Sequence, residues 1–245
     1  MILPTIRASF SRRDILHLVR LLGHGDEEIL VGAERRLDEE GADALLDDPR
    51  VLNALLTDPA ASAPTNLVFY VLVRHALLEV GISDRATADY VASLLVAFGR
   101  AGRAYRVSDS TTDEYHYLVD MVARLAGAER HEAFLIRSHL GNFSLWLSGL
   151  FPDYLEARSR RKGAPSIRYY ERMGSTGYHL AARSPLAAKL GLERVLSEVS
   201  EHFAGVRNAL NLVSDRYLYP RSGNPVNRLL REVEARRGGA QEGPR

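Results

Sequence analysis

The feature that most constrains the fold of this chain is an apolar pattern with a helical period, which recurs along most of the sequence. Its longest stretch lies between residues 192 and 217, where apolar side chains follow one another in alternating steps of four and three residues. Such a seven-residue repeat gives a helix one continuous apolar stripe that packs against neighbouring helices. We therefore expect one long helix in this stretch. The members of its stripe are Leu192, Leu196, Val199, Phe203, Val206, Leu210, Val213 and Tyr217.

Helix start signals divide the rest of the chain into further helices. Ser11, followed three residues later by Asp14, predicts a capping box at the start of the first one. Pro152 predicts the end of a long helix that carries an apolar line from Ile136 to Leu150. The other expected helices include residues 66–80, 110–125, 129–151, 166–182 and 226–235.

These patterns predict an all-α fold. We expect a multi-helix bundle of roughly nine to eleven helices with no sheet, in which most neighbours are antiparallel because their connections are short. A linker rich in alanine and proline at residues 58–64 separates a small N-terminal helical segment (1–60) from a main helical bundle (64–235). Residues 236–245 are expected to form a disordered tail. The sequence leaves open whether the two helical parts form one continuous domain.

Composition excludes several classes of site. The chain of 245 residues has no cysteine, which rules out disulfides, thiolate metal sites and cysteine nucleophiles. Its net charge of +1 gives no general attraction to nucleic acid or acidic membranes. The most apolar run, residues 67–73, is far shorter than the roughly 20 residues that a membrane span needs. We predict a cytoplasmic protein, and the dominance of arginine over lysine is typical of a GC-rich bacterial genome.

Known catalytic and cofactor motifs are missing from the sequence. It contains no glycine-rich dinucleotide motif, no Walker loop, no Gly-x-Ser-x-Gly and no Glu-x-x-His. The pairs His75/Glu79 and Glu198/His202 each share a helix face, but two ligands are too few for a tight metal site. We therefore expect no metal and no cofactor, and we assign no catalytic residue.

Polar residues on two of the expected helices indicate where a site would lie. Arg137, His139 and Asn142 flank the apolar line of the helix at 129–151, and such groups need internal hydrogen bonds or a ligand. Gly174 and Gly177 on the next long helix indicate either a close helix contact or room for a ligand. Nine of the eleven tyrosines and the single tryptophan follow residue 100, as in a chain with a pocket in its second half. The predicted ligand-binding residues are Arg137, His139, Asn142, Tyr169, Tyr170, Glu171 and His179.

Three functions are compatible with these features. The leading hypothesis is a non-catalytic protein that binds a protein partner or a small ligand. The first alternative is an enzyme that uses His139 or His179 as acid and base and Arg137 to hold an anionic substrate. The second is nucleic-acid binding through the basic run at residues 158–162, which is disfavoured because the run contains no aromatic residue and no known nucleic-acid-binding fold surrounds it. No membrane partner is expected, and a homo-oligomer is left open.

Overall fold

The all-α prediction is confirmed. A computed structural model of the chain describes residues 1–23, 26–57, 63–100, 102–108 and 113–218. Within these ranges it contains thirteen α-helices and no strand, and eleven of the helices have seven or more residues. The helices are α1 (Arg12–Leu22), α2 (Glu27–Glu40), α3 (Ala42–Leu46), α4 (Pro49–Thr57), α5 (Thr65–Glu79), α6 (Arg85–Phe98), α7 (Leu118–Leu125), α8 (Arg130–Leu150), α9 (Pro152–Lys162), α10 (Ile167–Ala182), α11 (Pro185–Lys189), α12 (Glu193–Glu201) and α13 (Phe203–Val213).

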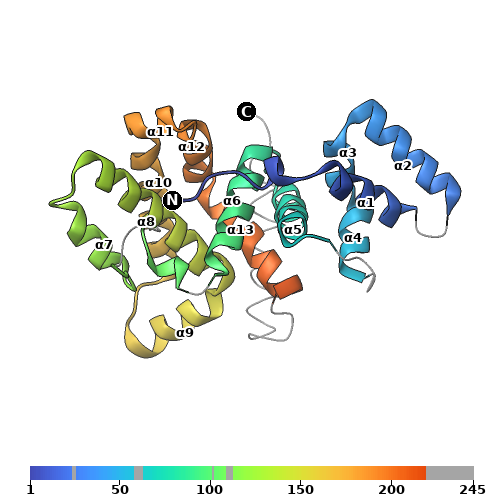
Figure 1. Cartoon of the computed structure of the whole chain (residues 1–245). Coiled ribbons are helices and arrows are strands. Elements are labelled where there is room, and N and C mark those ends of the chain that lie inside the picture. The colour runs from blue at the N-terminus through green and yellow to red at the C-terminus, as the bar shows by residue number, and fades with distance from the viewer. Residues whose placement is uncertain (24–25, 58–62, 101, 109–112, 219–245) are drawn as a thin grey trace, which may run out of the picture.

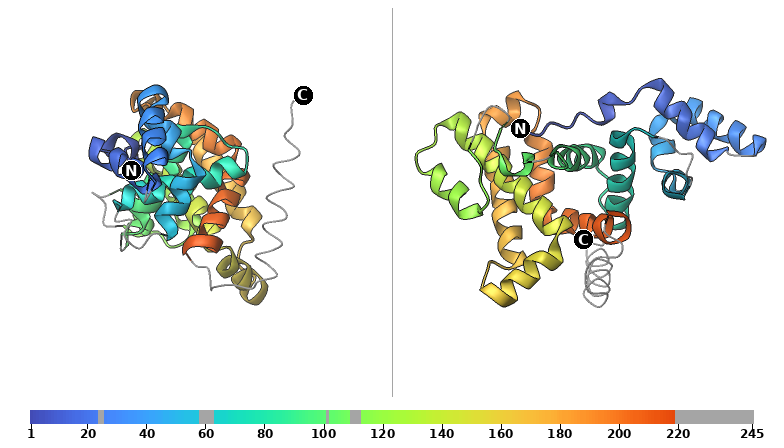
Figure 2. Two further views of the ribbon diagram at one scale, coloured as in Figure 1. Left: turned by 90° about the vertical axis from the view of Figure 1, so that its right-hand side faces the viewer. Right: turned by 60° about the horizontal axis from the view of Figure 1, so that its bottom comes forward.

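The helices form an elongated molecule with α5, α6 and α13 at its centre (Figure 1). Helices α1–α4 lie at one end and α7–α12 at the other, and α10 packs against both α8 and α12 (Figures 1 and 2). The largest group of buried apolar side chains contains Leu18, Leu46 and Val51 from the first four helices as well as residues of the central helices. The predicted helix at 226–235 and the predicted tail at 236–245 lie outside the described residues.

Helices whose starts are determined by neighbouring residues begin where the sequence predicts. At the start of α1, the Ser11 hydroxyl accepts from the backbone N–H of Asp14, and the Asp14 carboxylate accepts from the N–H of Ser11 at 2.8 Å. Because these bonds satisfy two groups at the helix end, the capping box fixes where α1 begins. The long helix expected at 129–151 is α8, and Pro152 starts α9 directly after it.

Two predictions of helix boundaries are wrong. The helix expected from residue 110 begins only at Leu118, and residues 109–112 lie outside the described part. Tyr115 is not helical because its N–H donates to the carbonyl of Tyr105 at 2.7 Å, next to an isolated bridge between Arg106 and Glu114. A contact with a distant segment therefore replaces the local helical hydrogen bond.

The long helix expected over 192–217 is interrupted at His202, where φ is −101° and ψ is 24°. The apolar stripe survives the break, because its members from α12 and α13, Phe203 included, are buried. The Ser175 hydroxyl donates to the carbonyl of Ser200 at 2.9 Å, and this bond satisfies one of the acceptors near the end of α12. The apolar period therefore predicted the buried face correctly but not the continuity of the helix.

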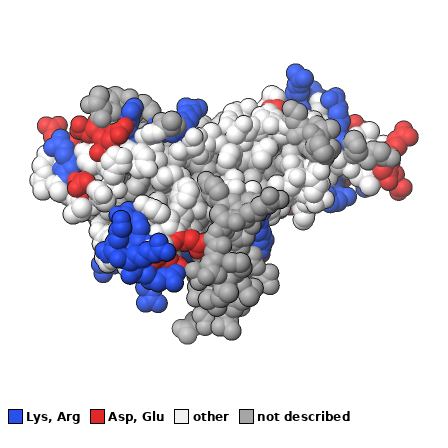
Figure 3. Space-filling model, turned by 90° about the horizontal axis from the view of Figure 1, so that it is seen from below, with Lys and Arg blue, Asp and Glu red and all other residues white. Residues whose placement is uncertain are grey.

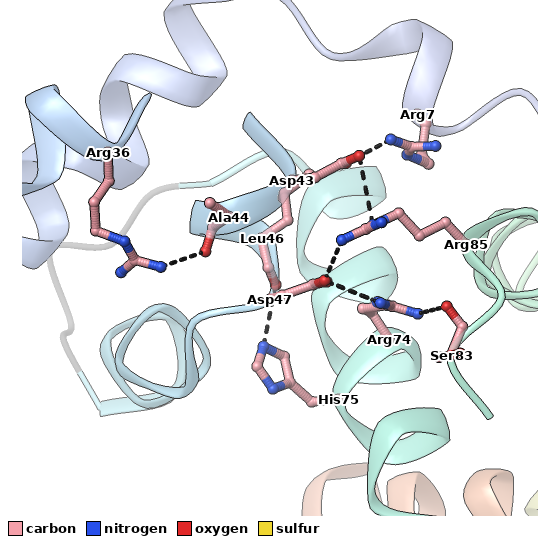
Figure 4. Close-up of polar contacts among 10 residues, drawn as sticks. All are labelled: Arg7, Arg36, Asp43, Ala44, Leu46, Asp47, Arg74, His75, Ser83 and Arg85. Carbon is pink, nitrogen blue, oxygen red and sulfur yellow. Dashed lines mark hydrogen bonds and ion pairs between the residues drawn. The ribbon is translucent and has the colours of Figure 1, made fainter. Parts of the chain in front are cut away.

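A group of charges, which we call the Asp47 network, joins the end of α3 to α5 and α6 (Figure 4). Arg74 donates to the Asp47 carboxylate at 2.7 and 2.9 Å and to the carbonyl of Ser83 at 2.7 Å. Arg85 donates to the same carboxylate at 2.6 Å. Burial raises the pKa of Asp47, but hydrogen bonds from Arg74 and Arg85 outweigh it and hold this pKa below its usual value. Arg74 is only 2% exposed, so its charge depends on these partners.

Helices α8 and α10 approach so closely that glycine is required between them. A Cβ atom on Gly177 would lie 2.8 Å from the backbone oxygen of Arg137, and one on Gly141 would lie 2.5 Å from the ring of Tyr178. The glycines of α10 therefore serve helix packing, which is one of the two explanations that their spacing allowed. Gly174 also belongs to this contact, because a Cβ there would lie 2.8 Å from the Cβ of Ser144 on α8.

Replacing Gly177 with alanine is expected to destabilise the fold by about 1–3 kcal/mol. The clash is with backbone of α8, which cannot move aside as a flexible side chain could. Gly32→Ala in α2 is the matched control, because a Cβ there meets nothing within 4 Å, and it should stabilise by up to about 1 kcal/mol. Urea denaturation measures both variants, and equal shifts of the two midpoints would contradict the close contact.

Candidate functional site

Asn142, one of the predicted polar residues on α8, is buried and has hydrogen-bond partners within the protein. Its side-chain oxygen accepts from the hydroxyl of Tyr90 at 2.7 Å and from that of Tyr178 at 2.8 Å. Burial raises the pKa of both tyrosines, so both hydroxyls keep their protons and act as donors. Since one carbonyl oxygen has two lone pairs, these two bonds satisfy the acceptor of Asn142 and both hydroxyl donors without a ligand.

His139 lies one turn away from Asn142 and is 2% exposed. Burial, together with the nearby charge of Arg103, lowers its pKa to about 3, so the ring is neutral at physiological pH. Its Nε2 atom has no hydrogen-bond partner among the described residues. A shielded, neutral ring does not fit the acid and base role that the enzyme hypothesis requires of it.

The other predicted residues lie in different surroundings. Arg137 is half-buried, and Glu171 accepts from Arg207 at 2.7 Å. His179 is exposed on α10. Tyr169 and Tyr170 contact each other edge to face, with ring centroids 5.9 Å apart, and Tyr170 also lines the pocket described next. The structure thus brings His139 and Asn142 together in the interior but places Glu171 and His179 elsewhere, and the common cavity stays a prediction.

A different cavity has the composition of a ligand site. We call it the aromatic pocket; it has a volume of about 450 Å³ and lies where α8, α9 and α10 meet the extended segment 113–117. Natural small-molecule pockets typically have about 300–1,000 Å³ and mostly apolar or aromatic walls with a few polar groups. Its lining residues are Tyr105, His116, Tyr117, Phe143, Trp146, Leu147, Phe151, Tyr154, Arg158 and Tyr170.

Contacts among the rings hold the inner wall of the aromatic pocket in place. Trp146 packs against Phe143 with centroids 5.9 Å apart and against Phe151 at 5.0 Å. The rings of Tyr105 and His116 lie 4.4 Å apart, beside the backbone pairing that makes segment 113–117 extended. Because each ring is fixed by another ring, the wall keeps its shape in the absence of a ligand.

The mouth of the aromatic pocket combines exposed rings with one positive charge. Tyr117 is 56% exposed and Tyr154 is 51% exposed, which is unusual for side chains of this size. Arg158 lies one turn after Tyr154 on α9 and donates to its hydroxyl at 3.1 Å. Among the described residues no carboxylate pairs with Arg158, so its guanidinium retains donors for an anion.

Sequence reasoning found only Tyr170 among the residues of this pocket. The tyrosines of this pocket all follow residue 100, where the sequence concentrates them, but the predicted site used residues of two helices only. Tyr105, His116 and Tyr117 come from a segment that was expected to be partly helical, which hid their nearness to α8. The pairing of that segment through Tyr105 and Tyr115 brings these rings to the pocket.

Other kinds of site find no support in the described part of the chain. No group of three or more His, Asp or Glu side chains is placed there to hold a metal ion. None of its helices combines the length and the apolar character that crossing a bilayer requires. Comparisons with protein-family models, with curated proteins and with solved structures found no match to this chain.

Proposed function

We propose that this protein binds a small planar ligand that carries a negative charge, and that it does so in the aromatic pocket without catalysing a reaction. The observation that carries the proposal is the pocket itself, whose aromatic walls surround a guanidinium with no carboxylate partner among the described residues. Flat ring systems stack on such walls, and arginine is suited to carboxylate or phosphate groups. A cytoplasmic location and a bacterial origin are part of the same proposal and rest on the sequence alone.

An enzymatic function is less well supported than ligand binding. The aromatic pocket contains His116, which lies 3.7 Å from the carboxylate of Glu114, but the lining that the structure describes includes no Ser, Thr, Lys, Asp or Glu side chain. The side-chain oxygen of Asn142 already accepts two hydrogen bonds, from Tyr90 and Tyr178. Binding is therefore the function that the geometry supports best.

The single tryptophan makes the proposal directly testable, because Trp146 lies in the wall of the pocket. Its indole N–H gives one signal in a ¹H–¹⁵N NMR spectrum. Titration with 2-naphthoate is expected to shift this signal, and calorimetry should give a dissociation constant. In the variant Arg158→Met the affinity for 2-naphthoate is expected to fall about tenfold, which corresponds to about 1.4 kcal/mol for one charge-assisted hydrogen bond.

Two controls separate this effect from a general loss of charge. The neutral analogue 2-naphthamide should bind wild type and Arg158→Met equally, because it has no negative group for the guanidinium. Arg161→Met removes an exposed positive charge from the same helix, outside the lining of the pocket, and should leave the affinity for 2-naphthoate unchanged. An indole signal that 2-naphthoate does not move would refute the proposal.

A further inference from the structure

The basic run read from the sequence continues the positive mouth of the aromatic pocket along α9. Arg160, Arg161 and Lys162 form the exposed last turn of this helix, directly after Arg158. Seen from below, where α9 faces the viewer, Lys and Arg side chains gather into one patch with few acidic side chains beside it (Figure 3). Glu156 pairs with Arg160 at 3.1 Å, whereas Arg161 and Lys162 have no carboxylate partner among the described residues.

We infer that the occupant of this site is a single-stranded nucleic acid, with one base stacked in the aromatic pocket and its neighbouring phosphates on the last turn of α9. The inference rests on the proposed function: a base of the strand is the planar group that enters the pocket, and a phosphate of the strand supplies the negative charge. Single-strand binding combines a positive track for the backbone with aromatic faces on which bases stack. Both elements meet here, because Arg158 belongs to the lining of the pocket and also to the basic run.

In the structure, aromatic rings lie close to the basic run, and this favours nucleic-acid binding more than the sequence alone does. The run contains no aromatic residue of its own, which disfavoured nucleic acid when it was considered alone. The structure places Tyr154 one turn before Arg158 and Tyr117 in the same pocket wall, each with more than half of its surface exposed. Exposed ring faces are what a base needs, whereas an acidic membrane surface would require only the charges.

The test uses fluorescence anisotropy with a labelled twelve-residue oligothymidylate at 50 mM NaCl. Wild type is expected to bind it and to lose affinity as the salt concentration rises, because phosphate contacts release counterions. Arg161→Gln/Lys162→Gln should weaken binding roughly tenfold and lower the slope of log K against log salt by about 1.4, since each single-strand contact contributes about 0.7. Arg12→Gln/Arg13→Gln, two exposed charges at the start of α1, is the matched control and should retain the wild-type slope.

Stacking is tested separately from charge. Tyr117→Leu is expected to weaken binding of the oligothymidylate about 5- to 150-fold, which is the range for loss of one stacked base. An abasic oligomer of the same length, which keeps the phosphates but lacks the bases, should bind wild type and Tyr117→Leu alike. Equal wild-type affinity for the abasic and the thymidine oligomers would overturn the inference, because it would leave the pocket empty.

The outcomes distinguish this inference from the proposed function. If 2-naphthoate binds and the oligothymidylate does not, the pocket serves a small molecule and the nucleic-acid inference fails alone. A second outcome is that phosphatidylglycerol vesicles bind wild type but not Arg161→Gln/Lys162→Gln, and that the oligothymidylate does not bind. In that case the basic run is a membrane contact and the inference fails as well. If neither 2-naphthoate nor the oligothymidylate binds, both statements fail together.

Discussion

Replacing Arg74 with methionine is expected to destabilise this protein by about 3 kcal/mol or more. Methionine keeps most of the volume of the side chain but removes the charge that faces Asp47 in the Asp47 network. The carboxylate then retains Arg85 as its main partner, and the carbonyl of Ser83 loses a donor. Because Arg74 is 2% exposed, water cannot replace these bonds without opening the junction between α3 and α5.

The control for this prediction is Arg194→Met. Arg194 also pairs with a carboxylate, that of Asp84 at 2.8 Å, but its side chain is 83% exposed. Exposed ion pairs contribute about 0–1 kcal/mol, so this variant should unfold at nearly the same urea concentration as wild type. Should Arg74→Met and Arg194→Met prove equally mild, the Asp47 network does not hold α3 against α5.

Lowering the pH below 6.5 is expected to destabilise the fold through His139. Its pKa is about 3 in the folded protein, below the ordinary value of 6.5, since burial disfavours the charged ring. Below pH 6.5 the unfolded chain therefore binds the proton that the folded chain excludes. The contribution of His139 is present in full above pH 6.5 and falls by about 1.4 kcal/mol per pH unit as the pH approaches 3. The loss amounts to roughly 3 kcal/mol at pH 4.5.

The slope of stability against pH tests this prediction. In His139→Gln the free energy of unfolding should depend less on pH between 6.5 and 4.5, even if the variant is less stable throughout. His179→Gln, which removes an exposed histidine from α10, should keep the wild-type slope. Burial also raises the pKa of Asp89 and lowers the pKa of His75, but both groups remain in His139→Gln, so their contributions cancel when the two slopes are compared. An unchanged slope in His139→Gln would contradict the shift.

The structural features that the sequence predicts correctly are those that depend on neighbouring residues. The Ser11 capping box, the start of α9 at Pro152 and the burial of Phe203 each depend on residues within a few positions, and each is found as expected. The start of α7 was predicted wrongly because the hydrogen bond from Tyr115 goes to Tyr105, across a segment whose pairing no local pattern encodes. Next to the break at His202, the Ser200 carbonyl accepts from a hydroxyl of α10, which is also a contact between distant residues.

The candidate site was harder to predict for the same reason. Arg137, His139 and Asn142 were selected because polar groups beside an apolar line need partners, and Asn142 indeed has them, but from Tyr90 and Tyr178. Tyr90 lies 52 residues away on α6, and no pattern along the chain predicts that α6 packs against α8. The aromatic pocket draws on five separate segments, so its existence follows from tertiary packing and not from spacing along the chain.

The contact between α5 and α13 has a consequence for how the chain is made. Glu79 at the end of α5 and Arg216 just after α13 form an ion pair although they are 137 residues apart in sequence. At synthesis rates of about 5–20 residues per second, the partner helix emerges roughly 7–27 s after α5. Helix α6 follows α5 at once and covers part of its apolar surface, but the side that α13 contacts stays open throughout this interval. On the ribosome, therefore, this side of α5 is an apolar surface of the nascent chain that needs protection throughout this interval.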